Sequence, residues 1–502
     1  MSDNSHELIL KNSIVYDVKS KIDGEKKDIL ISSGKIVDSL KNEQSAEVVD
    51  ASGCITFPGF IDVRSHIFAQ ETMYHHLLSQ SHNTRSDHST IEDMERAALE
   101  KGFTFLCEMD VPLTQSKITL HNMQLSPLLD HAMIMDIGSN WSFLGSLESE
   151  SVVEDIGNTL SLLMGLVKGL GISTNCPYHQ QYWKLENISD DSKIPMIPVK
   201  PLQIYNILSK AASDNIIKPH FLSPYNKEDS SVSQMDVLNG IDQPDFTLST
   251  ANQFFTEDVA DFVKYHASNE NFTCEITPFS LGHTYPLISR DRNLALRESK
   301  ASGILMTTVD LEFDTEYYIT GRNVDKNHPY LSNWVQMIKE LKNKSDLNRV
   351  VLSSNAPYHM GISDWSKHIY SLVGSQNEIS LLDICALLSS NPARILNLNT
   401  RKGYLGAGAD ADIICFQANP EKLDETSFSD TKFVVKGGYL VKKKSELLKS
   451  QGLEGKIYWN DGKFDSKKMA KTKKRLENFY DKRFSMHLSA LENKKFTQME
   501  KL

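Results

Sequence analysis

Segments with helical spacing of apolar residues alternate with short apolar runs through the middle of the chain. Helix-like spacing occurs at 90–101, 152–166, 201–213, 256–266 and 334–342, and strand-like runs occur at 104–109, 216–222, 272–276 and 349–353. Alternation of this kind over about 340 residues predicts a parallel sheet, and the (β/α)8 TIM-like barrel is its commonest closed form. The middle of the chain is therefore expected to be an α/β barrel.

The two ends of the chain are both rich in short β-prone runs. These runs cover 8–15, 28–32, 35–37 and 47–55 near the start, and 412–416 and 433–441 near the end. We therefore expect a small β-sandwich domain built from both termini, 1–57 with 398–460, and an inserted barrel over 58–397. A C-terminal helical extension follows over 461–502, with one amphipathic helix expected from Ser466 to about Leu491.

Composition restricts the class of partner. The chain has 502 residues and a net charge of −11, so it is long enough for more than one core and carries no general basic field for nucleic acid. The basic stretch from Lys467 to Arg483 is either a solvated helix face or a docking patch.

No long apolar run and no signal-peptide pattern is present, and the six cysteines form no CxxC pair. We expect a cytoplasmic protein with reduced thiols that does not enter a membrane.

Three motifs occur in a fixed order over some 350 residues. Pro58-Gly59-Phe60-Ile61-Asp62 leads to Arg64 and His66, Asn391-Pro392-Ala393-Arg394 follows a helix-like run, and Lys402-Gly403 precedes Gly408-Ala409-Asp410-Ala411-Asp412. Alternation along a strand points residues 64 and 66 to the same side. Together the motifs resemble the amidohydrolase superfamily, which implies a TIM-like barrel with a small β-domain.

Within that superfamily the chain resembles the A subunit of formylmethanofuran dehydrogenase and of formyltransferase/hydrolase complexes. The resemblance is carried by 11–17 followed by 22–29 and 32–37, by 167–169 leading to 175–177, by the helix at 199–212, by 253–254, and by the strand at 455–460 with the basic helix after it. It implies that the chain is one subunit of a multi-subunit complex. In that family the A subunit hydrolyses N-formylmethanofuran to formate, or makes it from formate, at a two-metal zinc centre.

The positions where the resemblance implies metal ligands hold other residues. Arg64 stands where the first histidine is expected, and a guanidinium cannot ligate a cation, so only His66 remains. Ser173 stands at the bridging lysine and Asn355 at the catalytic aspartate, where an amide is a poor base. His220 is available only through a shifted register. We therefore expect a degenerate site with no bound cofactor, or with zinc if the site has been remodelled.

The substituted site leaves several candidate roles open. Arg64, His66 and Asn355 are candidates for a substrate cleft, and His66 and His220 are residual candidates for a metal. Arg64 either binds a carboxylate such as formate by a forked contact, or fills the vacated space as a buried cation paired with an acid. The histidines between residues 66 and 88 are either a polar segment or a relocated metal site.

Three functions fit these observations. The first is a non-catalytic A-type subunit of a formyltransferase/hydrolase-like or formylmethanofuran dehydrogenase-like complex in one-carbon metabolism, with other subunits as partners and a methanofuran-type ligand as a candidate. The second is an active formyl-amide hydrolase with a remodelled metal site. The third is a stand-alone pseudoenzyme related to dihydroorotase and dihydropyrimidinase that acts as a binding module. Hydrolysis of this kind needs a metal-activated water, which favours the first.

Overall fold

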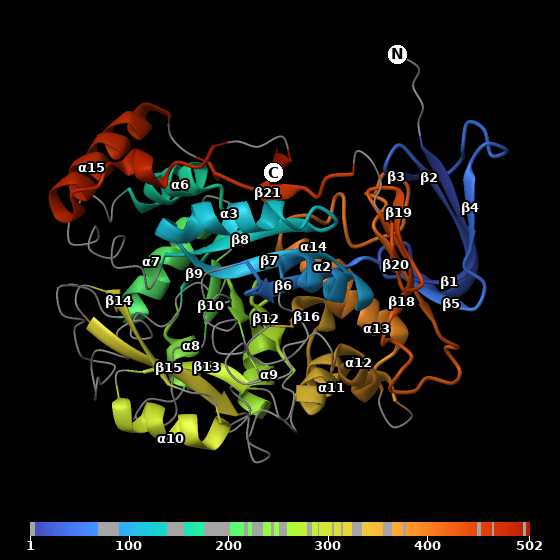
Figure 1. The fold of residues 1–502 in the computed structure, drawn as a ribbon, viewed down its shortest axis with the longest axis horizontal. Helices are drawn as coiled ribbons and strands as arrows, with labels where there is room; N and C mark the ends of the chain where they lie inside the picture. The colour runs from blue at the N-terminus through green and yellow to red at the C-terminus, as the bar shows by residue number, and fades with distance from the viewer. Residues whose placement is uncertain are drawn as a thin grey trace.

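The structure is a computed structural model in which an α/β barrel lies between a terminal β-sheet and a C-terminal helix (Figure 1). It describes residues 6–68, 90–137, 155–174, 201–214, 219–222, 234–241, 245–249, 251, 259–278, 284–289, 291–303, 306–312, 315–323, 334–354, 364–374, 378–448, 453–463, 466–494 and 498–502. Within these ranges, no helix combines the length and apolar character needed to cross a membrane.

The centre of the fold is a run of eight parallel strands among the described residues. In order around the sheet they are β6 (Phe60–Ser65), β7 (Phe103–Pro112), β8 (Asp130–Asp136), β9 (Gly171–Thr174), β10 (Pro219–Leu222), β11 (Thr247–Ser249), β12 (Thr273–Ile276) and β16 (Val350–Leu352). Neighbours in space follow the order of the chain, as in a barrel wound in one direction. The predicted barrel is confirmed.

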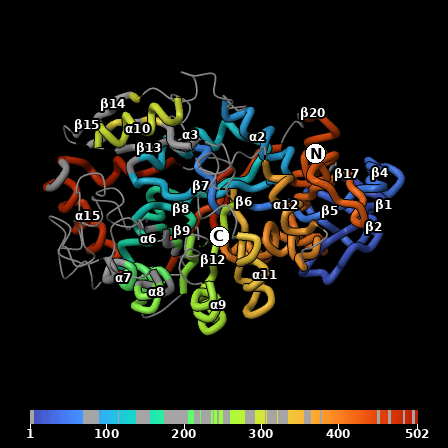
Figure 2. The backbone as a smooth tube through the Cα atoms, turned by 90° about the horizontal axis from the view of Figure 1, so that it is seen from below, coloured from blue at the N-terminus to red at the C-terminus, as the bar shows by residue number. Residues whose placement is uncertain are grey.

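Helices between these strands and after the last of them cover the outside of the barrel (Figures 1 and 2). They are α2 (Ile91–Glu100), α3 (Ser116–Gln124), α6 (Ile156–Val167), α7 (Pro201–Asp214), α8 (Gln234–Asn239), α9 (Val259–Ser268), α11 (Trp334–Lys344), α12 (Trp365–Val373), α13 (Leu381–Cys385) and α14 (Asn391–Ile395). The helices expected near 90, 152, 201, 256 and 334 are all present. Apolar side chains of α2, α6, α7, α9 and α11 join one large core.

Both termini contribute strands to one nine-stranded sheet at the opposite end of the molecule from α15 (Figure 1). The strands are β1 (Glu7–Asp17), β2 (Ile22–Ser32), β3 (Lys35–Val37), β4 (Glu47–Asp50), β5 (Cys54–Pro58), β17 (Ile413–Gln417), β18 (Thr431–Lys436), β19 (Tyr439–Lys443) and β20 (Glu446–Leu447). β5 pairs with β17, which joins the two ends of the chain, and the sheet has its own apolar core. The run expected over 47–55 is two strands, because the chain turns between β4 and β5.

The structure corrects the sequence analysis at the C-terminal end. β21 (Ile457–Trp459) lies in the range assigned to the terminal β-domain, but it pairs with barrel strand β8, and β22 (Met499–Lys501) pairs with β21. Helix α15 spans Ser466–Phe484 rather than continuing to residue 491, because Ser485 has a left-handed φ of 49°. A short 3-10 turn, Leu488–Leu491, follows it.

An antiparallel sheet interrupts the alternation of strand and helix after β12. It contains β13 (Thr284–Ser289), β15 (Thr315–Asn323) and β14 (Thr307–Glu312) in that spatial order, with helix α10 (Arg292–Ser302) beside it (Figure 1). The sequence analysis did not identify this insertion. Its helix begins at Asp291, whose carboxylate accepts from the backbone of Asn293 and Leu294.

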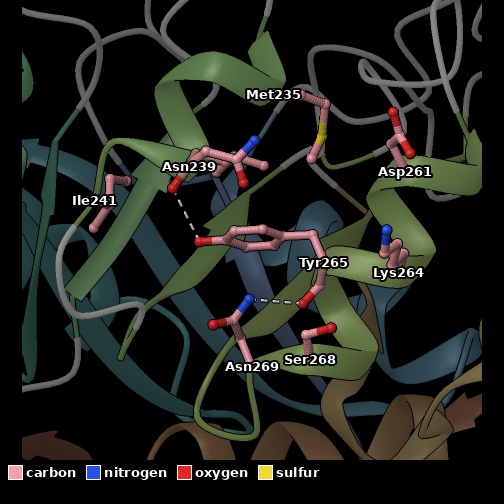
Figure 3. Close-up of a pocket in the computed structure, with 9 residues that line it drawn as sticks. Met235, Asn239, Ile241, Asp261, Lys264, Tyr265, Ser268 and Asn269 are labelled. Atoms are coloured by element: carbon pink, nitrogen blue, oxygen red, sulfur yellow. Dashed lines mark hydrogen bonds between the residues drawn. The ribbon is translucent and has the colours of Figure 1, made fainter.

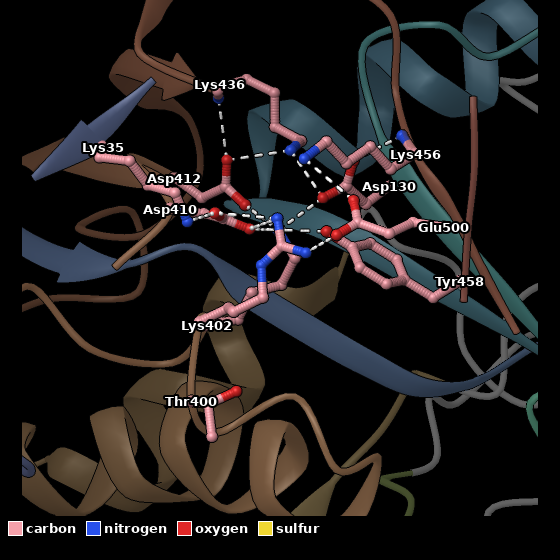
Figure 4. A network of polar contacts seen from close by, with 12 residues as sticks. Lys35, Asp130, Thr400, Lys402, Asp410, Asp412, Lys436, Lys456, Tyr458 and Glu500 are labelled. Carbon is pink, nitrogen blue, oxygen red and sulfur yellow. Dashed lines mark hydrogen bonds and ion pairs between the residues drawn. The ribbon is translucent and has the colours of Figure 1, made fainter. Parts of the chain in front are cut away.

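A buried network of charges joins the terminal sheet to the barrel (Figure 4). Asp130, the first residue of β8, lies 2.5 Å from Lys402 Nζ and 2.8 Å from Lys436 Nζ, and both lysines also contact Asp412. Burial raises the pKa of the Asp412 carboxyl, but Lys402 and Lys436 outweigh it and hold that pKa well below its ordinary value. The aspartates of the 408–412 motif are therefore structural ion-pair partners.

Candidate functional site

Polar side chains line the interior of the barrel at β6 and β7. Ile61 and Val63 belong to an apolar cluster with residues of β7, β8, β16, α14 and β21. The β6–β7 ladder changes register between Asp62 and Ser65, so simple alternation does not fix the side that Arg64 faces. The direction of Arg64 is given instead by its ion pair with Asp110.

Arg64 forms a buried ion pair with Asp110 of β7. Arg64 Nη2 lies 2.8 Å from Asp110 Oδ2, and each side chain is 6% exposed. The structure thus shows Arg64 as a buried cation paired with an acid, and its binding of a carboxylate ligand stays a prediction. Asp110 was not among the residues selected from the sequence. Its position at the carboxyl end of the strand expected over 104–109 was the available signal, because chemistry in barrels gathers there.

Local irregularities bring Arg64 and Asp110 together. The β6–β7 ladder changes register between Asp62 and Ser65, and the β7–β8 ladder changes register between Glu108 and Val111. Asp110 has a left-handed backbone with φ of 58°, which is uncommon for a residue other than glycine. Bulges of this kind redirect side chains and occur often beside functional sites.

His66 and Ser173 act on the same carboxyl group. Burial alone would raise the pKa of Asp110, but the charges of Arg64 and His66, the nearby Ser173 hydroxyl and the bond from Arg64 hold it below its ordinary value. Three of the residues selected from the sequence, Arg64, His66 and Ser173, are thus gathered around Asp110. They come from β6, the residue after it, and β9.

His220 lies on the next strand, β10, and is 1% exposed. It is paired in register with Ser173 of β9 and with Thr247 of β11. Side chains paired across a parallel ladder point to the same face, so His220 shares the face of Ser173. The role of His220 as a candidate metal ligand stays a prediction.

Asp62 closes the barrel between its first and last strands. Its Oδ1 accepts from the backbone N–H of Arg64 at 3.1 Å and of Ser354 at 3.1 Å, and its Oδ2 accepts from the Ser354 hydroxyl. Ser354 follows β16. Burial raises the pKa of Asp62 to about 7, although these hydrogen bonds act in the opposite direction. Asp62 is thus held as part of the barrel seam.

The remaining candidates lie outside the described residues. These are Asn355 and the histidines at 75, 76, 82 and 88. Across the parts of the chain that the structure describes, no group of three or more His, Cys, Asp or Glu side chains is arranged to hold a metal ion. The described residues at the Arg64 position do not fit a binuclear centre, because Arg64 supplies no ligand atom and its charge neutralises Asp110. The expected absence of a cofactor stays a prediction.

A separate pocket of about 450 Å³ lies outside the barrel, between α8 and α9 (Figure 3). Tyr265 crosses it and donates its hydroxyl to Leu238 O at 3.1 Å, and Asn269 donates to Tyr265 O at 2.8 Å. Burial raises the pKa of Tyr265 to about 12. The lining residues lead into the N-terminal ends of β11 and β12, the end of a barrel that serves stability rather than chemistry.

Comparisons with known proteins agree with this architecture. An amidohydrolase family model matches residues 351–442, from the last barrel strand to the terminal sheet. FwdA of Methanocaldococcus jannaschii is 23% identical over 512 residues, which cover 88% of this chain and 89% of that protein. A dihydroorotase of Elusimicrobium minutum is 22% identical over 446 residues, covering 82% of this chain and 88% of that protein.

Solved structures show the same fold. A chain of the formyltransferase/hydrolase complex FhcABCD from Methylorubrum extorquens, solved with methylofuran, superposes with a TM-score of 0.81 at 19% identity over 99% of each chain. Molinate hydrolase superposes with a TM-score of 0.54 at 10% identity, over 87% of this chain and 95% of that one. Fold and sequence thus identify an amidohydrolase-type barrel protein. Within that class, the chain resembles FwdA over most of its length.

Proposed function

We propose that this chain is a non-catalytic A-type subunit of a formyltransferase/hydrolase-like or formylmethanofuran dehydrogenase-like complex in one-carbon metabolism. The extended similarity to FwdA and the fold shared with a chain of FhcABCD support a subunit of a formylmethanofuran-related complex. The proposal gives the chain other subunits as partners and a methanofuran-type ligand as a candidate. It also places the chain in the cytoplasm.

The observation that carries the proposal is the buried Arg64–Asp110 ion pair. Hydrolysis of a formyl amide in this superfamily needs a water activated by metal ions, and the resemblance implies a ligand histidine where Arg64 stands. The guanidinium brings a permanent positive charge to that place, and this charge repels a cation. Ser173, at the place of the bridging lysine, cannot carry a carbamate.

One observation favours an active hydrolase with a remodelled site. His66 and His220 are both buried at the interior of the barrel, and imidazole is a good zinc ligand. That alternative needs a metal held by these two histidines with help from residues outside the described ranges. It predicts zinc-dependent activity that is lost when His66 is replaced.

An assay of formate release from an N-formylmethanofuran analogue distinguishes the non-catalytic subunit from the active hydrolase. We expect no release above the uncatalysed rate, with or without added zinc, for the wild type and for His66→Ala. His121→Ala, at an exposed position of α3, is the matched control. Zinc-dependent release that persists in His121→Ala and disappears in His66→Ala would establish the hydrolase instead.

A further inference from the structure

Helix α15 is firmly attached along one side. It packs against α6, with Leu476 and Tyr480 buried, and the Thr472 hydroxyl bonds to Asp155 at the start of α6. Arg475 Nη2 lies 3.3 Å from Thr159 Oγ1 and also faces Asp155. The inner side of this helix is therefore fixed by both apolar and polar contacts.

The segments on either side of α15 are also held. Ser161 of α6 donates to Lys463 O at 3.1 Å before the helix, and Asn493 donates to Val167 O at 2.7 Å after it. Beyond these points, β21 pairs with β8 and β22 pairs with β21. The helix is presented on a fixed base at one end of the molecule (Figures 1 and 2).

The first half of α15 presents a row of exposed lysines. We call this the lysine ridge, and it consists of Lys467, Lys468, Lys471, Lys473 and Lys474. Between residues 466 and 475 there is no acidic residue, and the sixth cation, Arg475, turns inward to α6. A chain with a net charge of −11 thus concentrates five positive side chains on two and a half turns of one helix.

The ridge is only partly compensated within its own helix, where Lys473 Nζ lies 4.0 Å from Glu477 Oε1. The N-terminus of a helix carries partial positive charge and favours acidic residues, but the first turn of α15 has none. Lys467 and Lys471 are four residues apart, and Lys471 and Lys474 are three apart, so like charges are neighbours.

We infer that the lysine ridge is the docking surface for an acidic surface of a partner protein. The inference rests on the proposed function, because a subunit of a complex requires a partner. A carboxylate-rich protein surface matches the ridge in charge. Phosphate recognition favours outward arginines, which this stretch lacks, and membrane binding requires exposed apolar residues, of which its outer side offers only Ala470.

Binding of a labelled 20-residue polyglutamate peptide to the full chain, followed by fluorescence anisotropy at several salt concentrations, tests the charge preference. Reversal of four ridge charges (K467E, K468E, K471E and K474E) is expected to weaken binding at least tenfold. A control with the same charge change at exposed lysines of the terminal sheet (K26E, K27E, K443E and K444E) is expected to bind like the wild type. Equal weakening in both variants would overturn the inference, as would tighter binding to phosphatidylserine vesicles or duplex RNA.

Native mass spectrometry of the complex purified from the source cells distinguishes the two proposals. If the wild type carries partner subunits and the ridge variant loses them while the control keeps them, the docking surface is supported. If the ridge variant keeps the same partners, the inference is wrong and the proposed function stands. A wild type that carries no partner removes the subunit function and, with it, the partner that the ridge was assigned.

Discussion

At the scale of single residues, the site is defined by a charge balance. The resemblance implies that histidines and carboxylates hold metal cations at this place. Here the positive charge is the guanidinium of Arg64, whose Nη2 lies 2.8 Å from Asp110 Oδ2. A buried charge is tolerated when it is paired, and the charge of Arg64 helps to hold the pKa of Asp110 below its ordinary value. His66 and Ser173 lie beside it, and His220 is paired in register with Ser173 on the next strand.

Removing one partner of the pair is expected to destabilise the fold strongly. Asp110→Asn keeps a residue that tolerates the left-handed backbone, but it leaves Arg64 buried without its counter-charge. We predict a loss of about 3–5 kcal/mol in the free energy of unfolding, measured by urea denaturation. The double variant Arg64→Met/Asp110→Asn should recover most of that loss, because no buried charge is then left unpaired. Additive losses in the double variant would contradict the pairing.

Glu95 of α2 gives the protein a pH dependence of stability. It accepts from Ser126 Oγ at 2.9 Å and from Leu128 N at 2.5 Å, and burial raises its pKa from 4.5 to about 7. Below pH 4.5 the carboxyl is protonated in both the folded and the unfolded chain. Between pH 4.5 and 7 the unfolded chain releases the proton first, so the contribution to stability is lost as the pH rises through this window.

Glu95→Gln isolates this contribution, because the amide oxygen can accept the same two hydrogen bonds without ionising. We predict that the free energy of unfolding of the wild type falls relative to the variant between pH 4.5 and 7, with a slope of up to ~1.4 kcal/mol per pH unit. Above pH 7 the difference should become constant. Parallel curves for the two proteins across the whole range would show that Glu95 ionises normally.

At the scale of elements, the C-terminal segment acts as a strap across the barrel. Gly455 N donates to Pro127 O at 2.7 Å, Lys456 N donates to Asp130 Oδ1 at 2.7 Å, and β21 then continues beside β8. A Cβ atom added at Gly455 would lie 1.7 Å from Leu129 O, so only glycine lets the strap approach so closely. This approach brings the chain into register for the pairing of β21 with β8.

Gly455→Ala is expected to loosen the strap without unfolding the barrel. We predict faster cleavage by trypsin within residues 456–502 and a lower free energy of unfolding, by more than about 1 kcal/mol. Gly165→Ala, in helix α6, is the control, because its Cβ would meet only Asp461 at an ordinary distance of 3.4 Å. Cleavage that is no faster than in Gly165→Ala would mean that β21 docks independently of Gly455.

The sequence predicted regular elements well and contacts between them poorly. Periodicity located α2, α7, α9 and α11, because each has one apolar face that the barrel covers. It missed the sheet formed by β13, β14 and β15, because an insertion follows no repeat of the barrel. It also missed Asp110, whose role depends on two register shifts and a left-handed backbone that no spacing of residues indicates.

At the scale of the whole molecule, one buried charge network joins parts of the chain that are far apart in sequence. Lys402 contacts both Asp130 at the start of β8 and Asp412 just before β17. Glu500, near the C-terminus, joins this network through ion pairs with Arg401 and Lys456. Ion pairs at the N-terminal end of the strands therefore hold the 402–412 motif, one of the three that resemble the amidohydrolase class, against the barrel. Arg64, Asp110 and Ser173 lie elsewhere, toward the carboxyl ends of β6, β7 and β9.

The central claim is that this barrel holds an ion pair where its relatives are expected to hold metal ions. Plasma mass spectrometry of the untagged protein, purified without chelator, measures this directly. The account predicts less than about 0.1 metal ion per chain, because Arg64 neutralises the carboxylate that remains. A content of about two zinc ions per chain would contradict it and would mean that His66, His220 and residues outside the described ranges form a working centre.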